Sequence, residues 1–331
     1  MRFLLFPFAI LYGLAVRLRH FLYDRGWLQS KQYPFPTLCV GNLAVGGTGK
    51  TPMVEYLVRL LGEEQVAILS RGYRRKTKGF VLADTSATAL TLGDEPFQYH
   101  RKFSKATVAV CENRQEGIEQ LLKRPNFQVI LLDDAFQHRK VQAGLNLLLT
   151  SYSQLYTNDF LLPVGSLRDI RSRACKAQII LVTKCPNLSE EAQQKIIQQL
   201  QPLAYQQVFF TRIAYAEEVC REGESQPLED FLSTPFTLVT GIANPTPLVS
   251  FLQGKGAHFT HLSYSDHHHF SEKEIASLSQ HERLLTTEKD YVRFGNALSQ
   301  LYYLPIKTEF LNEKDKEAFD KKILSFVFSK F

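Results

Sequence analysis

The sequence lacks several patterns that would assign a protein of 331 residues to a class at once. Its five cysteines are scattered and form no C-x-x-C pair, which argues against a disulfide framework or a zinc knuckle and fits a reducing cytosol. No run of Lys and Arg is long enough, or interleaved enough with aromatic residues, to predict a nucleic-acid interface. No apolar run reaches the about 20 residues that cross a bilayer, and no internal repeat or low-complexity tract stands out.

The composition is that of a globular chain with a surplus of positive charge. Hydrophobic residues make up 44% of the sequence and charged residues 22%, and the length is sufficient for two domains. The net charge of +6 suits an anionic partner, which is a nucleotide, a phospholipid surface or a phosphorylated substrate. The charge alone does not choose among these three.

A glycine-rich stretch, LCVGNLAVGGTGKT at residues 38–51, begins with a strand-like run and precedes a helix-like run at 52–61. It resembles a phosphate-binding P-loop, whose backbone N–H groups and following helix N-terminus cradle phosphate oxygens. In such a loop the lysine contacts the β- and γ-phosphates, and the hydroxyl of the next residue binds Mg²⁺. The pattern G-x-x-x-x-G-K-[ST] has glycine where this chain has Ala44, so a chance glycine turn is the alternative. The predicted phosphate-binding residues are Gly46, Gly47, Thr48, Gly49, Lys50 and Thr51.

The N-terminus is almost wholly apolar over residues 3–16, and Arg17, Arg19, His20 and Arg25 follow. A signal peptide fits poorly, because its charges would precede the apolar run and a small-residue cleavage site would follow it. We expect residues 1–26 to form a helix in the membrane interface, with its apolar face in the lipid and its arginines near anionic head groups. The alternative is a helix packed on the protein's own core.

Short apolar runs recur along the first part of the chain, at 37–41, 66–70, 107–110, 129–132, 145–150 and 179–183. Their alternation with helix-like stretches predicts an α/β fold of the P-loop NTPase type, with a mostly parallel sheet and helices on both faces. Right-handed crossovers then place the loops carrying Thr51, Asp94 and Asp133 on one edge of the sheet.

The chain changes character near residue 207. Extended segments at 207–216 and 301–309 flank a smaller α/β unit at 217–300, and we expect the two segments to pair as a linker between lobes. The P-loop lobe then covers residues 27–206. A last helix at 313–331 is expected to return to that lobe.

Two acidic pairs are candidates for chemistry. Asp133-Asp134 follows four apolar residues, which is the Walker B pattern, where a carboxylate at a strand end holds Mg²⁺ directly or through water. Many buried strands also end in aspartate. The other pair, Asp94-Glu95, would supply a base and a metal ligand, although adjacent carboxylates also suit a helix N-terminus.

Two further features are less specific. The cluster Asp266-His267-His268-His269 places an aspartate beside histidines, which orients an imidazole and tunes its pKa. The same cluster also fits a transition-metal site or a polar loop. The basic loop that begins at Arg71 follows a strand, at the sheet edge where ligands bind in open α/β folds. Phosphate contact and solvated charge remain equally open for this loop.

Together these motifs occur in the order found in tetraacyldisaccharide 4′-kinases, the lipid A 4′-kinases of Gram-negative bacteria. The chain resembles that family from its apolar N-terminus to about residue 292. The shared motifs are Val40-Gly41-Asn42, Gly46-Gly47-Thr48-Gly49-Lys50-Thr51-Pro52, Ser70-Arg71-Gly72-Tyr73, Gly93-Asp94-Glu95-Pro96, Asp133-Asp134-Ala135-Phe136-Gln137-His138, Leu162-Pro163-Val164-Gly165, Asp266-His267-His268 and Thr287-Glu288-Lys289-Asp290.

The resemblance implies a lipid kinase that uses ATP and Mg²⁺ and transfers the γ-phosphoryl group to the 4′-hydroxyl of tetraacyldisaccharide 1-phosphate, giving lipid IVA. It also implies a monotopic protein at the cytoplasmic face of the bacterial inner membrane, with the nucleotide near the junction of two lobes. The roles it implies are a base at Asp94, its partner at His267 or else His268, phosphate neutralisation by Lys50, metal ligands at Thr51, Glu95, Asp133 and Asp134, and phosphate contacts at Arg71, His138 and Arg168.

The chain departs from the family pattern at two places. Leu167-Arg168-Asp169 stands where Leu-Arg-Glu is expected, which keeps the charge but shortens its reach, and Ser265 replaces the proline before the histidine motif. Two rival classes are a switch NTPase or metallochaperone, for which the guanine motif Asn-Lys-x-Asp is missing, and a membrane adaptor with a vestigial P-loop. None of these motifs bears on acyl-chain preference or oligomeric state.

Overall fold

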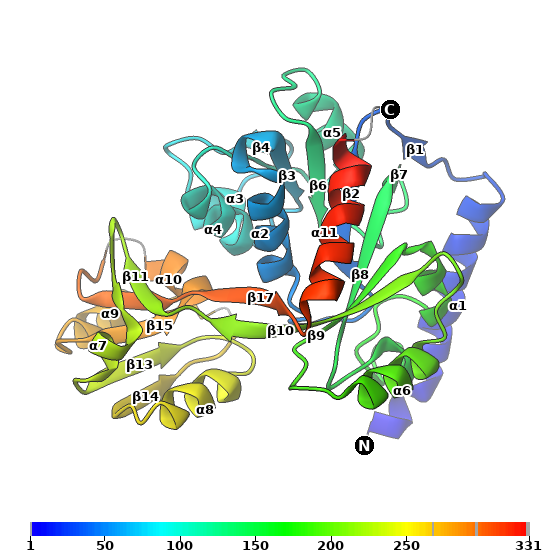
Figure 1. The fold of residues 1–331 in the computed structure, drawn as a ribbon. Helices are drawn as coiled ribbons and strands as arrows, with labels where there is room; N and C mark the ends of the chain where they lie inside the picture. The colour runs from blue at the N-terminus through cyan, green and yellow to red at the C-terminus, as the bar shows by residue number, and fades with distance from the viewer. Residues whose placement is uncertain (1, 267, 295–296, 329–331) are drawn as a thin grey trace.

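The computed structural model describes residues 2–266, 268–294 and 297–328, and it contains two main β-sheets that lie side by side (Figure 1). The larger sheet is formed by strands between residues 37 and 215 together with the strand at 306–310, and the smaller sheet is formed by strands between residues 218 and 304. This architecture confirms the predicted α/β fold with a mostly parallel sheet and helices on both faces.

The larger sheet has nine strands in the order β17-β10-β9-β8-β2-β6-β3-β5-β4. All neighbouring strands in it are parallel except the two edge strands, β4 and β17, which run antiparallel to their neighbours. The strands are β2 (Thr37–Asn42), β3 (Val66–Ser70), β4 (Val81–Leu82), β5 (Thr107–Val110), β6 (Val129–Asp133), β8 (Leu145–Ser151), β9 (Ile179–Thr183), β10 (Gln207–Tyr215) and β17 (Ile306–Phe310).

Alternating side chains of these strands enter two separate hydrophobic cores, because successive residues of a strand point to opposite faces. Cys39 of β2 joins the core beneath α5 and α6, whereas Leu38 and Val40 join the core beneath α2, α4 and α11. The helices around this sheet are α1 (Phe6–Asp24), α2 (Lys50–Leu61), α3 (Ala89–Leu92), α4 (Asp94–Lys102), α5 (Arg114–Leu121), α6 (Glu190–Leu200) and α11 (Glu313–Phe328). A two-stranded parallel pair, β1 (Lys31–Gln32) with β7 (Val141–Gln142), lies apart from both sheets.

The smaller sheet has six strands in the order β12-β11-β16-β15-β13-β14, and four of them run parallel. Its strands are β11 (Glu218–Arg221), β12 (Glu224–Pro227), β13 (Phe236–Thr240), β14 (Phe259–Ser263), β15 (Leu284–Thr287) and β16 (Leu301–Leu304). Its helices are α7 (Leu228–Leu232), α8 (Thr246–Gly254), α9 (Glu272–Leu278) and α10 (Glu288–Phe294).

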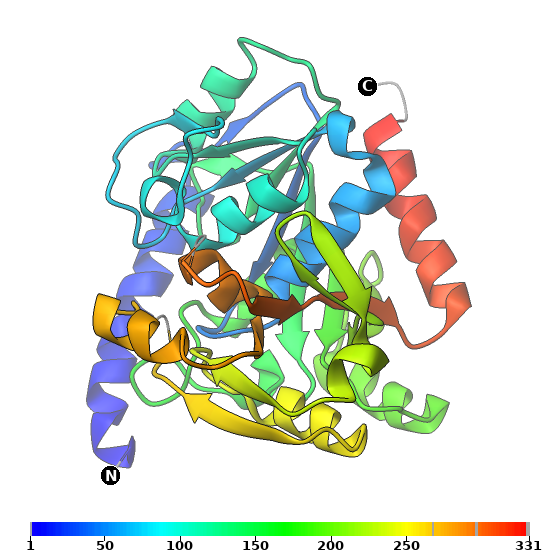
Figure 2. The same ribbon diagram turned by 90° about the vertical axis from the view of Figure 1, so that its left-hand side faces the viewer.

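The two sheets are joined by a two-stranded ribbon, formed by β10 and β17, and by packed helices. The second half of β10, from Thr211, pairs antiparallel with β17, so the chain leaves and re-enters the larger sheet through neighbouring strands. The segment 301–309 contains two strands: β16 belongs to the smaller sheet and β17 to the larger. Helix α10 packs against α4 across the junction (Figure 2), and α11 packs against β10 and β17 beside α2 (Figure 1).

Helix α1 runs along the outside of the larger sheet and follows a short 3-10 turn, Arg2–Leu5 (Figure 1). Only Ala9, Gly13 and His20 of this helix are buried. Leu11, Leu14 and Leu18 are between 55% and 63% exposed, which is unusual for large apolar side chains on one helix. Within the described residues, no helix combines the length and the apolar character that crossing a bilayer requires.

Candidate active site

The glycine-rich loop connects the end of β2 with the start of α2 at the carboxyl edge of the larger sheet. Gly46 and Gly49 have φ angles of +108° and +82°, a region in which side chains other than glycine are strained. Residues at the ends of two strands of the larger sheet hold the loop: Asn42 Nδ2 donates to Thr48 Oγ1 at 2.8 Å, and Thr183 Oγ1 donates to the Thr48 carbonyl at 2.9 Å. The loop backbone is therefore fixed before any ligand arrives, with the N-terminus of α2 behind it.

Asp133 ends strand β6 directly beside this loop, where Val40 of β2 is its partner in the parallel ladder. Ser70 Oγ, at the end of β3, donates to Asp133 Oδ2 at 3.3 Å. Burial raises the pKa of Asp133 to about 7, and the negative charges of Asp134 and Glu95 add to the effect, while Lys50 opposes it. Asp133 is thus a buried carboxyl group that a cation would stabilise in its charged form.

Asp134 has a positive φ of +51°, and this turn directs its side chain toward Arg168 and Lys50. Arg168 binds it with both terminal nitrogens, one at 2.9 Å, and Lys50 Nζ lies 3.6 Å from Oδ1. Burial acts to raise the pKa of Asp134, but the hydrogen bond from Arg168 and the charge of Lys50 outweigh it and lower the pKa to about 2. Arg168 also donates to Asn42 Oδ1, so it connects the carboxylate to the P-loop.

The predicted metal ligands Thr51, Glu95, Asp133 and Asp134 supply the oxygen donors that Mg²⁺ prefers. Mg²⁺ is usually held by one or two carboxylates together with substrate phosphates, so a closed cage of protein ligands is not required. Accordingly, the described residues include no cluster of three or more His, Cys, Asp or Glu side chains that would hold an ion alone. The residues fit a Mg²⁺ that binds with the nucleotide, and Asp133 fits it better than Asp134, whose two oxygens already accept from Arg168.

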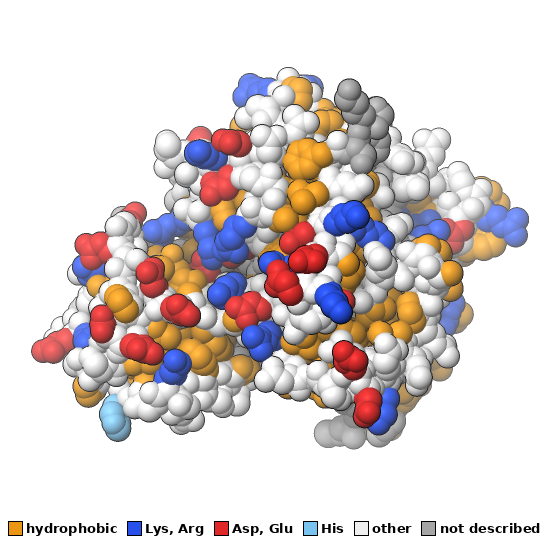
Figure 3. Space-filling view, viewed as in Figure 1, with side chains coloured by type: hydrophobic (Ala, Val, Ile, Leu, Met, Phe, Trp, Pro, Cys, Tyr) orange, Lys and Arg blue, Asp and Glu red, His pale blue; other side chains and the backbone are white. Residues whose placement is uncertain are grey.

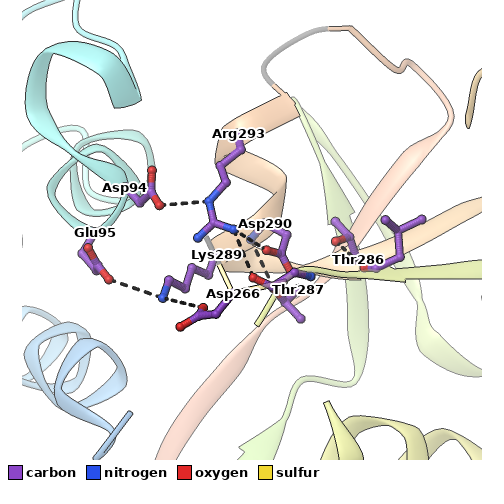
Figure 4. Close-up of polar contacts among 10 residues, drawn as sticks. Asp94, Glu95, Asp266, Thr286, Thr287, Lys289, Asp290 and Arg293 are labelled. Carbon is purple, nitrogen blue, oxygen red and sulfur yellow. Dashed lines mark hydrogen bonds and ion pairs between the residues drawn. The ribbon is translucent and has the colours of Figure 1, made fainter. Parts of the chain in front are cut away.

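Asp94 and Glu95 form the first turn of α4 and face the second lobe across the junction (Figure 4). Arg293 of α10 donates from Nε to Asp94 Oδ2 at 2.9 Å, and its Nη1 donates to Asp290 Oδ1 at 2.8 Å. Lys289 Nζ lies 3.7 Å from a carboxylate oxygen of Glu95. Lys and Arg side chains gather beside the hollow between the two lobes (Figure 3). The predicted base is therefore held by a cation from the opposite lobe.

The histidine cluster is described in part. His267 lies outside the described residues. His268 Nε2 lies 2.9 Å from Glu274 Oε1, and its ring packs between Tyr264 and Phe270 within the second lobe. Asp266 lies 3.7 Å from Lys289 Nζ, the same ammonium group that approaches Glu95 (Figure 4).

The remaining predicted phosphate contacts lie on neighbouring loops of the same sheet edge. Arg71 follows β3 and is exposed. His138 follows the Asp133-Asp134 turn, and burial together with the positive charges of Arg114, Lys140 and others lowers its pKa to about 4. The positive charges around His138 create a potential that suits an anion.

Sequence reasoning missed three residues that shape this site. Asn42 was present in a quoted motif but received no role, although it bridges Thr48 and Arg168. Arg114 is almost fully buried and donates to the Asp133 carbonyl at 3.2 Å, which its position at the start of a polar helix did not reveal. Arg293 lies three residues after Asp290, and residues at this spacing lie on the same face of a helix. This spacing was the sequence signal that could have indicated the contact of Arg293 with Asp290.

Comparisons with known proteins agree over the whole length of the chain. The family model described as tetraacyldisaccharide-1-P 4′-kinase (LpxK) matches residues 1–327. A tetraacyldisaccharide 4′-kinase from Flavobacterium johnsoniae is 50% identical over 99% of this chain and 97% of its own length. The enzyme of that name from Bacteroides thetaiotaomicron is 42% identical over 98% of this chain and 92% of its own.

A solved structure shows the same fold. The crystal structure of LpxK from Aquifex aeolicus in complex with ATP aligns with a TM-score of 0.80 and 28% sequence identity, and it covers 99% of both chains. On this evidence, and in agreement with the motifs of the sequence, the chain belongs to the tetraacyldisaccharide-1-phosphate 4′-kinase family.

Proposed function

We propose that this chain transfers the γ-phosphoryl group of ATP to the 4′-hydroxyl of tetraacyldisaccharide 1-phosphate, the step of lipid A biosynthesis that gives lipid IVA. Membership of the kinase family over residues 1–327 supports this reaction. The observation that carries it is the meeting of a P-loop, the Asp133-Asp134 turn and Asp94 at one junction between lobes. A nucleotide site on one lobe then faces an acceptor site bordered by the other.

The P-loop lobe binds the triphosphate of ATP. The backbone of residues 46–49 and the N-terminus of α2 receive the phosphate oxygens, and Lys50 neutralises charge on the β- and γ-phosphates. Thr51 and Asp133 would hold Mg²⁺ in this site, with Glu95 nearby. When bound, the ion neutralises charge that develops on the phosphates during transfer. Arg168 holds Asp134 and Asn42 in place beside Lys50.

Asp94 accepts the proton of the 4′-hydroxyl while the hydroxyl oxygen forms a bond to the γ-phosphorus. The bond between that phosphorus and the bridging oxygen breaks, and the electron pair leaves with ADP. Arg293 fixes the orientation of Asp94 from the second lobe. His267, from the same lobe, is the proposed partner of Asp94. We expect this pair to form fully when the two lobes move together about the strands β10 and β17; the lobes are residues 27–206 with α11 and residues 217–300. Such closure would also exclude water from the site.

Helix α1 is the proposed membrane contact. Leu11, Leu14 and Leu18 form part of an apolar face that is open to the surroundings. Arg17 and Arg25 are exposed on the same segment and suit anionic head groups. The acceptor is an acylated disaccharide whose chains stay in the bilayer, so a monotopic protein at the cytoplasmic face of the inner membrane can reach both it and cytosolic ATP.

The test is label transfer from γ-labelled ATP to tetraacyldisaccharide 1-phosphate in detergent micelles with Mg²⁺. Asp94→Ala should reduce kcat by roughly 10²- to 10⁴-fold, the usual worth of a general base, with little change in ATP affinity. Asp230→Asn, at an exposed aspartate of α7, is the matched control. Near-normal turnover of Asp94→Ala would remove this residue from the mechanism. ATP hydrolysis that ignores the lipid, with no transfer, would favour a switch NTPase.

A further inference from the structure

Helix α1 makes direct polar contacts with the two loops that carry the phosphate-site residues. Tyr12 Oη donates to the Arg168 carbonyl at 2.8 Å, and Arg19 Nη2 donates to the Gln137 carbonyl at 2.9 Å. Gln137 in turn donates from Nε2 to the Asn42 carbonyl at 2.6 Å, at the start of the P-loop. The helix is therefore connected to the active site on its inner face, while its outer face is apolar and exposed.

A further contact of α1 is a buried pair between His20 and Asp169. His20 Nε2 lies 2.6 Å from Asp169 Oδ1, and the two side chains are only 5% and 2% exposed. On the other side of the ring, Arg139 Nη1 lies 3.3 Å from Nδ1. Since an arginine can only donate, Nδ1 accepts and the imidazole proton lies on Nε2, which donates it to Asp169.

Asp169 is the residue next to Arg168, whose guanidinium group holds Asp134 and Asn42. The second oxygen of Asp169 is buried and has no hydrogen-bond partner among the described residues. Asp169 Oδ1 accepts from His20 and from the backbone N–H of Ile170 at 2.8 Å, and Tyr12 holds the carbonyl of Arg168 itself. Two bonds from α1, together with the bond from the Arg168 N–H to the Leu43 carbonyl at 2.8 Å, therefore hold the backbone from which Arg168 reaches into the phosphate site.

We propose that His20 and Tyr12 are positioning residues, which couple the placement of α1 to the placement of Arg168. This inference rests on the proposed function, because it assigns Arg168 to the phosphate site. The helix that contacts lipid then also holds the group that organises the nucleotide phosphates.

The test is a double-mutant cycle on nucleotide binding, measured with a fluorescent ATP analogue and purified full-length protein in micelles. Arg168→Ala and His20→Leu should each weaken binding, His20→Leu by about 10- to 100-fold, by analogy with the groups that orient metal ligands. The double variant should bind no more weakly than Arg168→Ala alone, because His20 acts through Arg168. Additive losses in the double variant would overturn the proposal.

Two further variants separate positioning from a loss of folding. His20→Gln places an amide N–H near the position of Nε2, so it should restore binding to within about 3-fold of wild type. Tyr12→Phe removes one hydroxyl and should weaken nucleotide binding without lowering the melting temperature. Wild-type affinity in Tyr12→Phe, or failure of His20→Gln to rescue, would contradict the assignment of these residues. His258→Leu, at an exposed histidine of the second lobe, is the control.

A failure of the positioning role and a failure of the kinase reaction give different experimental results. The double-mutant cycle and the Tyr12 variant both measure nucleotide binding. They therefore test His20 and Tyr12 even if no label is transferred to the lipid. Absence of transfer by the wild type would reject the kinase reaction alone. Normal transfer with additive losses in the cycle would reject the positioning role alone.

Discussion

A half-buried lysine between two buried carboxylates connects the lobes and should make their stability depend on pH. Lys102 Nζ of α4 lies 2.6 Å from Glu55 of α2 and 2.6 Å from Glu288 of α10. Arg59 also contacts Glu55, at 3.1 Å, but the attraction of these cations for Glu288 is smaller than the cost of its burial. Burial, together with the charge of Glu55, raises the pKa of Glu288 from 4.5 to about 7. We predict that Glu288→Gln removes a pH-dependent part of the free energy of unfolding.

The sign follows from which state of the protein holds the proton. Below pH 4.5 Glu288 is protonated in both folded and unfolded chains, so it contributes no difference. As the pH rises from 4.5 to 7, the unfolded chain loses its proton first, and the folded state is destabilised progressively. At about 1.4 kcal/mol for each pH unit between the two pKa values, the full loss above pH 7 is about 3 kcal/mol. Between pH 5 and 8 the change amounts to about 2 kcal/mol.

The assay is urea unfolding of wild type and Glu288→Gln at pH 5, 6, 7 and 8, followed by circular dichroism. The variant should gain stability relative to wild type as the pH rises, by about 2 kcal/mol over this range. Lys102 keeps Glu55 as a partner in the variant, so no new unpaired charge is created. Glu317→Gln, at an exposed position of α11, should follow the wild type at every pH. If the free energy of unfolding of Glu288→Gln minus that of wild type stays constant or falls as the pH rises, the reasoning is refuted.

Three other predictions concern the P-loop, the helix α1 and the packing behind the site. Lys50→Ala should reduce kcat by roughly 10²- to 10³-fold, the usual effect of losing one preorganised group that stabilises charge. It should also weaken binding of a fluorescent ATP analogue, and an unchanged titration would argue against the P-loop assignment. Deleting residues 1–19 should move the protein from the membrane fraction to the soluble fraction, and continued sedimentation with membranes would place the anchor elsewhere. Gly41→Ala should lower the free energy of unfolding by roughly 1–3 kcal/mol, because the new Cβ would lie 2.5 Å from the Phe136 Cβ; unchanged denaturation would show that Phe136 moves aside at no cost.

The strands around the P-loop were predictable because each is a short apolar run that ends at a polar or glycine residue. Strand β6 shows this well, since Val129–Asp133 is buried throughout and ends in the acidic pair. The segment 301–309 was predicted as one linker strand, but it contains β16 and β17 in different sheets. A short apolar pattern reports that a segment is extended and does not report which neighbour it pairs with.

The contacts within the site were less accessible to sequence reasoning. The motifs placed the loops of Thr51, Asp94 and Asp133 on one edge, because that follows from parallel topology. The pairing of Asp94 with Arg293 joins residues 199 positions apart, and it depends on how the two lobes pack. Likewise, His20 follows an apolar N-terminal run and received no role from the sequence, whereas it is buried against Asp169. Such pairs arise from tertiary packing, for which a single sequence holds no local pattern.

The position of α11 has a consequence for the order in which the protein is made. Tyr56 of the P-loop helix donates to Asp320 of α11 at 2.7 Å, and the core beneath that helix includes Phe310, Phe319 and Ile323. These residues are translated only after the entire second lobe. While the ribosome is still elongating, the P-loop helix therefore has an uncovered apolar surface, and a nascent chain should need chaperone protection until β17 and α11 emerge.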